Sequence, residues 1–397
     1  MLKLKTPESD KISIRHYEGV KYYINQVLDF YINFFEIING AKPIDDAVNI
    51  LYTNSDLESI TITYLAKSLG YGQAKKKKIK KSNVVDACTN PKTYLNPLFY
   101  NDKAKLLSFF KKLKTDLKSI IISSPVELLK IDRDLKTTFP FISKPDGLYV
   151  EPIRRILLLN IFHYKKFSNN ENHGFPKNKD KTESWERYDL AKALNVSTCA
   201  YCNRIYTYTV IKKTGKGVIS PSMDHFFDKS NFPLFALSFY NLIPSCTNCN
   251  STLKGTKKFS LAEFVHPYLN GFDDNATFSY KALDTDAAYG NSDNLRIYLK
   301  PKKGSSIERQ IRNNIKLFEL DEIYCQHSDY VQELIKKKEI SNERYLEILR
   351  HDTYKDFNLT LEDAYRLAFG NYFNDEDFQK RPMAKMTKDL VKELKMI

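Results

Sequence analysis

The chain has 397 residues, 42% of them hydrophobic, and carries 62 Lys and Arg against 48 Asp and Glu, for a formal net charge of +14. This length and apolar content allow two or three domains and exclude a largely disordered chain, while the positive charge favours a polyanionic partner without choosing among DNA, RNA and anionic lipid. No apolar run reaches the roughly 18 residues of a membrane span and no signal-peptide pattern begins the chain, so we expect a cytoplasmic protein with no membrane contact.

The first part of the chain, residues 1–168, is predicted to be mainly helical. Apolar residues recur at helical spacing over residues 20–38 and again over residues 106–121. The segment Ser124–Glu127 offers an N-cap serine, a proline at the first helical position and a capping-box glutamate. The run KKKKIKK, Lys75–Lys81, is either a solvated loop or a contact to phosphates. We find no catalytic motif in this region.

The pattern changes after residues 169–184, a polar stretch broken by Gly and Pro that is predicted to be a linker. Residues 205–213 are rich in β-branched and aromatic residues and predict a strand, TGKG predicts a turn, and residues 217–223 predict the returning strand. A helix is expected from about residue 247 or 248 to Gly255. From about Ser306 onward the chain is again predicted to be helical, so the fold class expected is α+β, mostly α.

Four of the six cysteines fall in two C-x-x-C pairs, Cys199/Cys202 and Cys246/Cys249. Without an export signal, this grouping favours metal thiolates over disulfides. Four thiolates close a tetrahedral structural Zn²⁺ with no open position. We therefore expect a zinc ion that performs no hydrolysis and holds the strand pair against the helix after the second pair.

Residues that could bind a divalent cation through oxygen, or transfer a proton, lie between and beside these cysteines. Asp224 and Asn250 offer the oxygen ligands that Mg²⁺ or Mn²⁺ prefers, and the few protein ligands would leave positions for water and phosphate. His225 has the pKa range of a general base at neutral pH. Asn241 suits a positioning role, with its amide bonded to the backbone around His225. Each residue alone also has an ordinary structural explanation.

In this order the residues resemble the motifs of the HNH endonucleases. The resemblance is carried by CAYCNR (Cys199–Arg204), MDHFFDKS (Met223–Ser230), YNLIPSC (Tyr240–Cys246) and CNSTLK (Cys249–Lys254), and it covers the chain from Cys199 to about Lys258. It implies a ββα-metal fold, in which a β-hairpin and a helix hold one catalytic divalent ion.

The resemblance also implies a role for each motif residue. His225 would be the general base, Asp224 and Asn250 would bind the catalytic Mg²⁺ or Mn²⁺, Asn241 would orient the loop of His225, and the four cysteines would bind structural zinc. The family often has His at the position of Asn250, so this chain is an H-N-N variant, and the departure puts its metal preference in doubt.

Three further residues are weaker candidates for contact with a substrate phosphate: Lys254, Arg204 and His266. Lys254 lies one helical turn beyond Asn250. For Arg204 a surface salt bridge is an equal alternative, and for His266 a structural role beside Pro267 is the alternative.

The expected organisation is a helical region at 1–168 for partner or nucleic-acid contact, a linker at 169–184, an HNH nuclease domain at 185–275 and a helical region at 276–397. More loosely, the whole chain resembles bacterial HNH proteins of anti-phage and mobile-element settings. The expected activity is hydrolysis of phosphodiester bonds in DNA by a water that His225 activates. A partner protein that activates or targets the enzyme is a further expectation. The alternative is a zinc-dependent nucleic-acid-binding or sensor module that does not cut.

Overall fold

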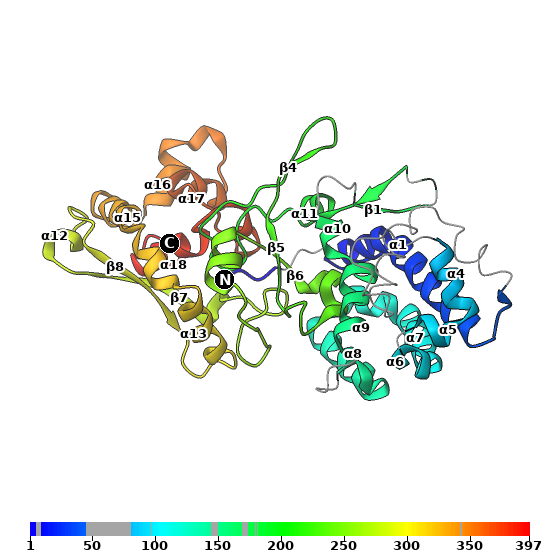
Figure 1. Ribbon diagram of the computed structural model, residues 1–397. Coiled ribbons are helices and arrows are strands. Elements are labelled where there is room, and N and C mark those ends of the chain that lie inside the picture. The colour runs from blue at the N-terminus through cyan, green and yellow to red at the C-terminus, as the bar shows by residue number, and fades with distance from the viewer. Residues whose placement is uncertain are drawn as a thin grey trace. The chain divides into compact units, whose positions relative to one another are not determined.

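The computed structural model describes residues 1–4, 9–44, 81–95, 97–143, 150–168, 174–178, 180, 182–341 and 344–397. Over these residues the chain is mostly helical with four small two-stranded sheets, which confirms the predicted α+β, mostly α class (Figure 1). Residues 75–80 of the Lys-rich run and residues 169–173, 179 and 181 of the expected linker lie outside the described residues. No helix in the described ranges has the length and hydropathy needed to cross a membrane.

The chain divides into two compact units, and each is assembled from segments that are not adjacent in sequence. Unit 1 contains Met1–Ser9, Ala191–Phe226 and Ile243–Ile397, and unit 2 contains Asp10–Leu190 and Phe227–Leu242. The expected regions, in contrast, are four consecutive stretches. The function expected of each of those stretches stays a prediction.

The helices of unit 2 follow the predicted apolar stripes. Helix α1 (Ser9–Ile38) and helix α7 (Lys103–Ile122) bury these stripes, and Tyr31 of α1 stacks on Phe110 of α7 with ring centroids 4.8 Å apart. Helix α8 (Pro125–Thr138) begins with the predicted capping box: Ser124 Oγ accepts from Glu127 N, and Ser124 N donates to the Glu127 carboxylate at 3.1 Å. These three predictions are confirmed.

Shorter elements complete unit 2. They are α4 (Lys81–Thr89), α5 (Pro91–Tyr94), α6 (Pro97–Asn101), η2 (Pro140–Ile142), α9 (Val150–Ile156), η3 (Leu157–Ile161), α10 (Tyr164–Ser168), α11 (Arg187–Leu194, whose last residues enter unit 1), η4 (Pro233–Leu237), η5 (Phe239–Asn241) and the strand pair β1 (Phe175–Pro176) and β2 (Ser184–Trp185). The pair β1–β2 lies in and next to the expected linker.

The segment Phe227–Leu242 is buried within unit 2. Ser238 Oγ donates to Ile120 O of α7 at 2.5 Å, and the ring of His16 on α1 contacts Leu237 O through Nε2 at 2.8 Å. The other ring nitrogen of His16 accepts from Trp185 Nε1 at 3.0 Å. Because one ring nitrogen accepts and the other contacts a carbonyl, His16 is bound as a neutral imidazole and is a structural residue.

The strands of unit 1 near the cysteines are shorter than predicted. The first predicted strand is reduced to β3 (Val210–Ile211), preceded by an isolated bridge between Thr198 and Tyr206. The predicted returning strand is divided into two short strands. Strand β4 (Gly217–Ile219) pairs with β3, whereas β5 (Ser222–His225) pairs with β6 (Leu242–Ser245). Pro221 lies at the interruption, because proline has no N–H to donate to a ladder.

Directly after β6 comes the predicted helix. It is η6 (Asn248–Lys254), a π-helix, and it ends at Gly255, whose φ is +52°. Glycine adopts this left-handed region without a Cβ penalty. The predicted helix and its end are therefore confirmed. The order β5, β6, η6 brings two paired strands and a helix together around the second cysteine pair.

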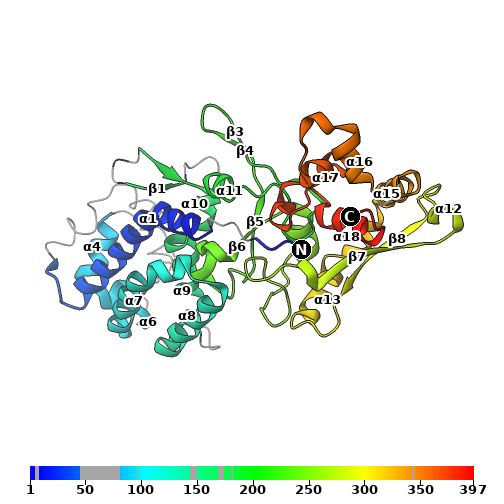
Figure 2. The same ribbon diagram turned by 180° about the vertical axis from the view of Figure 1, so that it is seen from behind.

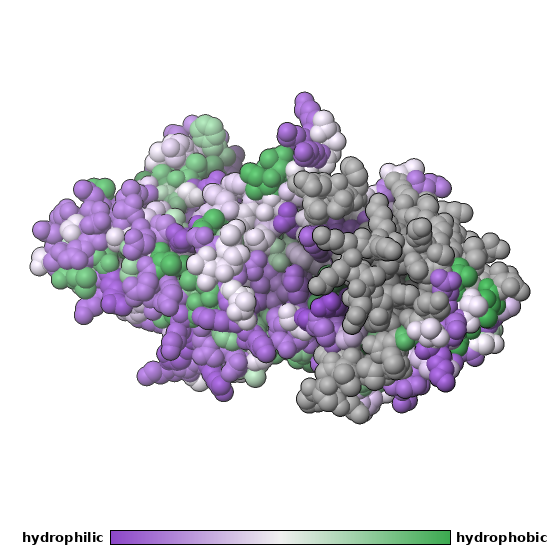
Figure 3. All heavy atoms as spheres, viewed as in Figure 1, coloured by the Kyte–Doolittle hydropathy of each residue, from purple (hydrophilic) through white to green (hydrophobic). Residues whose placement is uncertain are grey.

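The remainder of unit 1 begins with a hairpin that the sequence analysis missed. Strand β7 (Ala276–Ala282) pairs antiparallel with β8 (Leu295–Pro301). The helices after Ser306 were predicted and are confirmed, and those packed on the hairpin include α14 (Leu320–Cys325) and α18 (Ala384–Glu393) (Figures 1 and 2). The others are α12 (Thr285–Ala288), α13 (Glu308–Leu317), α15 (Ser328–Ile340), α16 (Tyr345–Ile348), α17 (Leu361–Phe369) and the short turns η7 to η10 (Asp273–Asn275, Leu349–Thr353, Lys355–Phe357 and Asp375–Lys380). Hydrophilic residues predominate on the face of this region seen in Figure 3, with hydrophobic residues scattered among them.

Candidate metal centre and active site

The four cysteines of the two C-x-x-C pairs form one buried cluster in unit 1. The Sγ atoms of Cys199, Cys202, Cys246 and Cys249 all lie within 4.8 Å of one another. A tetrahedral zinc ion with Zn–S bonds of about 2.3 Å places its sulfurs about 3.8 Å apart, so the cluster fits such an ion. Across the described part of the chain, this is the only group of three or more His, Cys, Asp or Glu residues close enough to hold a metal. The cluster can bind a metal such as zinc.

Backbone groups around the cluster support thiolate ligands. Arg204 N donates to Cys202 Sγ at 3.4 Å, and Cys249 N lies 3.5 Å from Cys246 Sγ. Burial raises the pKa of Cys199 well above its ordinary value, so a thiolate there needs a positive charge beside it. A bound divalent metal supplies that charge, and its binding would release protons from the thiols.

The first cysteine pair is also tied to the strands of the candidate site. Ala200 N, between the two cysteines, donates to Pro244 O of β6 at 3.1 Å. Ser245 of β6 donates through Oγ to Ser222 O of β5 at 3.1 Å. Because the second cysteine pair follows β6 directly, both pairs and both strands form one local structure in unit 1.

Asp224 lies on β5 and its side chain is bound inside unit 1. Lys254 Nζ donates to Oδ1 at 2.8 Å and to Oδ2 at 2.6 Å, and Tyr201 Oη donates to Oδ2 at 2.5 Å. Asp224 and Lys254 are only 5% and 3% exposed. Lys254 Nζ also donates to His225 O at 2.5 Å, so all three of its protons have acceptors.

This arrangement bears on two of the expected roles. The sequence suggests a phosphate as the partner of Lys254, whereas its ammonium is bound to Asp224 within the protein. The sequence also suggests that Asp224 and Asn250 hold a divalent ion. An ammonium in contact with both carboxylate oxygens repels such an ion, so the donor set as it stands does not fit catalytic Mg²⁺.

Asn241 is fully buried at the end of η5 in unit 2. Its Oδ1 accepts from Phe227 N at 2.7 Å, and its Nδ2 donates to Phe227 O at 3.1 Å and to Phe235 O at 2.9 Å. Phe227 follows His225 by two residues in the chain. The amide of Asn241 therefore fixes the backbone of Phe227, two residues after the end of β5.

His225 is the last residue of β5 and is half-buried. Its carbonyl accepts from Lys254, and Phe227, two residues later, is bonded to Asn241.

His266 is buried with its ring centroid 4.2 Å from that of Phe226, and its Nδ1 accepts from Tyr268 N at 3.2 Å. These contacts favour the structural alternative for His266.

Arg204 is half-buried, and no carboxylate forms an ion pair with it in the part of the chain that the structure describes. It lies close enough to His327 to lower the pKa of that imidazole, although burial is the larger cause. The surface salt bridge offered as the alternative for Arg204 is therefore absent from the described residues, and contact with a phosphate stays a prediction.

Tyr201 is a residue of the site that the sequence analysis missed. It lies inside the first C-x-x-C and is fully buried, and burial raises the pKa of its hydroxyl well above its ordinary value. It therefore stays protonated and donates to Asp224. Tyr324 makes a similar contact, donating to Cys202 O at 2.6 Å. No spacing in the sequence links either tyrosine to its partner.

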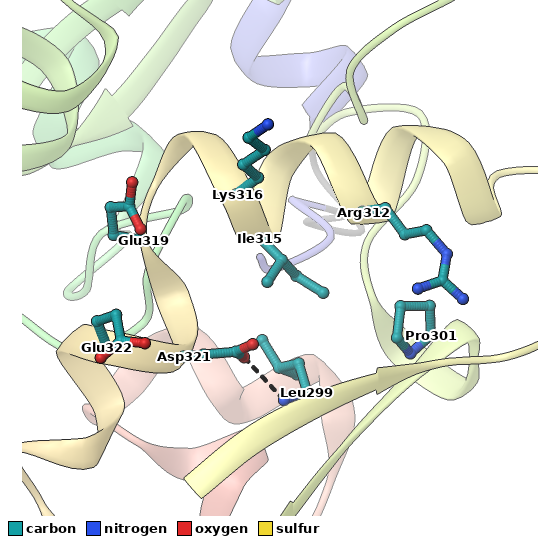
Figure 4. Close-up of a pocket in the computed structure, with 8 residues that line it drawn as sticks. All are labelled: Leu299, Pro301, Arg312, Ile315, Lys316, Glu319, Asp321 and Glu322. Carbon is teal, nitrogen blue, oxygen red and sulfur yellow. Dashed lines mark hydrogen bonds between the residues drawn. The ribbon is translucent and has the colours of Figure 1, made fainter.

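A pocket of about 280 Å³ opens elsewhere in unit 1, between β8, α13 and α14 (Figure 4). The basic side chains Arg312 and Lys316 come from α13, the acidic ones are grouped over residues 319–322, and Asp321 accepts from Leu299 N at 2.9 Å. The lining residues are Leu299, Pro301, Arg312, Ile315, Lys316, Glu319, Asp321 and Glu322. None of them belongs to the predicted site.

Comparison with protein families, with curated proteins and with solved structures finds no match to this chain.

Proposed function

We propose that this chain is a nuclease of the HNH type that hydrolyses phosphodiester bonds in DNA, with His225 as the general base. The observation that carries the proposal is the buried amide of Asn241, which bonds to both the N–H and the carbonyl of Phe227. Three hydrogen bonds to backbone compensate the burial of this amide, and they hold the loop that follows His225 directly. The motif resemblance supports the same assignment.

In this proposal His225 accepts a proton from the water that attacks the phosphorus. A histidine at the end of a short strand whose carbonyl accepts from Lys254 loses little backbone freedom when substrate binds. Transition-state charge on the phosphate needs a nearby positive group.

The resemblance assigns Mg²⁺ or Mn²⁺ to Asp224 and Asn250, and an ion would bind there only with the Lys254 ammonium displaced from the Asp224 carboxylate. Once bound, such an ion would stabilise charge on the phosphate. Because Lys254 competes for the Asp224 carboxylate, the ion requirement is tested separately. With Lys254→Met, the Mn²⁺ concentration for half-maximal cleavage should fall at least tenfold if ammonium and ion compete. An unchanged value, with zinc retained in the variant, removes Asp224 from the proposed ion site, and calorimetric titration of the wild type with Mn²⁺ gives an independent measure.

The main experiment is nicking of supercoiled plasmid by wild type and His225→Ala, each with Mg²⁺, with Mn²⁺ and with EDTA. The matched control is His351→Ala, which removes an exposed histidine of unit 1. Wild type and control should cut when a divalent ion is present, and His225→Ala should lose at least a hundredfold in rate with its zinc content unchanged. If His225→Ala cuts as fast as the wild type, His225 is not the base.

The proposal also includes the setting. The net charge of +14 suits a nucleic-acid partner, and the long helical regions outside the motifs offer surface for a partner protein that activates or targets the enzyme. A cluster of reduced cysteines suits the cytoplasm. An anti-phage or mobile-element role follows from the resemblance alone.

One observation favours a second function, a zinc-dependent nucleic-acid-binding or sensor module that does not cut. The buried pair of Asp224 and Lys254 satisfies both charges within the protein, as a purely structural ion pair would. This alternative predicts DNA binding with no cleavage by wild type in any metal, and no effect of His225→Ala on binding.

A further inference from the structure

The hairpin β3–β4 exposes an unusual set of side chains. It projects from the body of unit 1 (Figures 1 and 2). Tyr206 is 42% exposed, Tyr208 is 49% exposed and Val210 is 42% exposed, while Thr207 between the tyrosines is buried. Alternate residues of an extended segment point to the same side, so the three exposed side chains share one face. Ile219, 55% exposed, joins them because it pairs with Val210. We call these four residues the Tyr206 face.

The two tyrosines of the Tyr206 face are stacked on each other. Their ring centroids are 4.6 Å apart and their planes differ by 19°. Stacking of this kind is ordinary in a core, as for Tyr31 and Phe110 in unit 2. At an exposed position it keeps both rings ordered and in one orientation, with flat aromatic surface open to a ligand.

The base of the hairpin is fixed to the cysteine cluster. Cys199 N donates to Ile205 O at 3.0 Å, and Thr207 N donates to Ser197 O at 2.8 Å. These bonds lie on either side of Tyr206. The aromatic pair therefore stands on backbone that the first C-x-x-C holds in place, and little conformational entropy would be lost when a ligand binds.

The hairpin that carries the Tyr206 face is basic. From Cys199 to Met223 the chain has no Asp or Glu but has Arg204, Lys212, Lys213 and Lys216. The three lysines are exposed at and beside the turn. Arg381 lies close enough to Tyr208 to act on it electrostatically. Within the described ranges, neither Arg381 nor any of these lysines forms an ion pair with a carboxylate.

We propose that the Tyr206 face binds an unpaired nucleic-acid strand, with bases stacked on Tyr206 and Tyr208 and phosphates held by Lys212, Lys213 and Lys216. Exposed aromatic rings beside unpaired lysines are the elements of single-strand binding, because every base has a flat face and every linkage has a charge. Duplex DNA offers the charge, but its bases are already stacked on each other. The substrate of the proposed nuclease is therefore single-stranded nucleic acid or a duplex with an unpaired segment, a statement that rests on the proposed function.

The test measures binding separately from cleavage. All proteins carry His225→Ala, and no divalent ion is added. The probes are fluorescein-labelled oligothymidine of about 16 nucleotides, the same length of oligouridine, and a duplex of the same length, followed by anisotropy. The variants are Tyr206→Ala/Tyr208→Ala, the conservative Tyr206→Phe/Tyr208→Phe, and Lys212→Ala/Lys213→Ala/Lys216→Ala. The matched charge control is Lys281→Ala/Lys302→Ala/Lys303→Ala, three exposed lysines of unit 1 outside the hairpin.

The parent should bind single strands at least tenfold more tightly than duplex. The double alanine variant should lose tenfold or more in single-strand affinity, and the phenylalanine variant should keep it, because ring stacking needs no hydroxyl. The triple lysine variant should reduce the slope of log K against log salt by about 2, since each phosphate contact on a single strand contributes about 0.7. The control variant should change the single-strand affinity and the salt slope less than the hairpin variants do. Binding to either homopolymer supports the proposal, and the comparison shows which sugar is preferred.

Zinc content and the thermal unfolding midpoint of each variant exclude a folding defect. Equal single-strand affinity in the double alanine variant and its parent overturns the proposal, as does a parent that prefers duplex. If the wild type cuts neither plasmid nor a single-stranded oligonucleotide with Mg²⁺ or Mn²⁺ while these binding results hold, the nuclease proposal fails and the single-strand site stands.

Discussion

Lys254 and Asp224 form a buried ion pair in which one ammonium contacts both carboxylate oxygens, at 2.8 and 2.6 Å. Their side chains are 3% and 6% exposed, so water screens neither charge. Removing one partner leaves the other charge buried and unpaired, which typically costs about 3 to 5 kcal/mol. The pair therefore connects the strand β5 to the end of η6 at a site where function is also proposed.

From this pair we expect Lys254→Met to lower the free energy of unfolding by about 3 kcal/mol. Adding Asp224→Asn to the same chain should recover part of that loss, because the unpaired charge is then gone. Thermal unfolding of the two single variants and the double variant gives the coupling free energy. Additive losses in the double variant would show that the pair is not coupled.

Asn241→Ala should lower cleavage by at least a hundredfold with zinc content unchanged. The variant leaves Phe227 N buried without its acceptor, and each such group costs about 1 to 3 kcal/mol. The resulting freedom of the loop should lower the turnover number more than it weakens substrate binding, which a kcat and KM comparison detects. Asn270→Ala, at an exposed asparagine of unit 1, is the control. Full activity of Asn241→Ala would remove the positioning role.

Cys246→Ser should abolish zinc binding and unfold the cluster region. Metal analysis of the wild type should give about one zinc per chain, the number that four thiolates bind. Cys325→Ser, at a half-buried cysteine outside the cluster, should keep the metal. Equal zinc content in both variants would place the metal elsewhere.

Two buried histidines should make the protein less stable in mild acid. Burial lowers the pKa of His16 to about 4, and burial followed by Lys166 lowers that of His163 to about 4. Between the unfolded value of about 6.5 and the folded value, the unfolded chain binds protons that the folded chain does not, so stability falls as pH falls. From pH 6.5 to 5 the loss is up to about 2 kcal/mol for each group.

Thermal unfolding at pH 7 and pH 5 measures this loss. His16→Gln should show a smaller difference between the two pH values than the wild type, whatever its stability at pH 7. His351→Gln, at an exposed position, should behave as the wild type does. If His16→Gln keeps the full pH dependence, protonation of His16 is not its source.

The parts of the fold that the sequence predicts are those that depend on short-range spacing. Helices α1 and α7 follow from apolar residues three and four apart, α8 from its capping box, and the cysteine cluster from two C-x-x-C pairs. The Tyr201–Asp224–Lys254 network could not be predicted in this way. Its members are 23 and 30 residues apart, and their contacts depend on where several strands and a helix lie.

The predicted strand boundaries were wrong for a similar reason. The segment 217–223 has the composition of one strand, but its two halves pair with different partners, β3 and β6. Hairpin β7–β8 was missed although β8 alternates clearly, with Leu295, Ile297 and Leu299 buried and the residues between them more exposed. Strand β7 departs from alternation only at Phe278 and Ser279, which are both buried. Composition records the tendency to be extended, whereas pairing is decided by residues far away in the chain.

The discontinuous units have a consequence for biosynthesis. Translation completes Asp10–Leu190 long before Phe227–Leu242 emerges, yet that later segment fills the interior of unit 2, against Ile120 and His16. Cys246 and Cys249 are translated only after it. Metal capture by all four thiolates therefore has to wait until Cys249 has been translated. A ribosome that pauses before Phe227 would leave a nascent chain in which unit 2 lacks its interior segment and the cluster has only Cys199 and Cys202. Neither unit can be produced as one uninterrupted fragment.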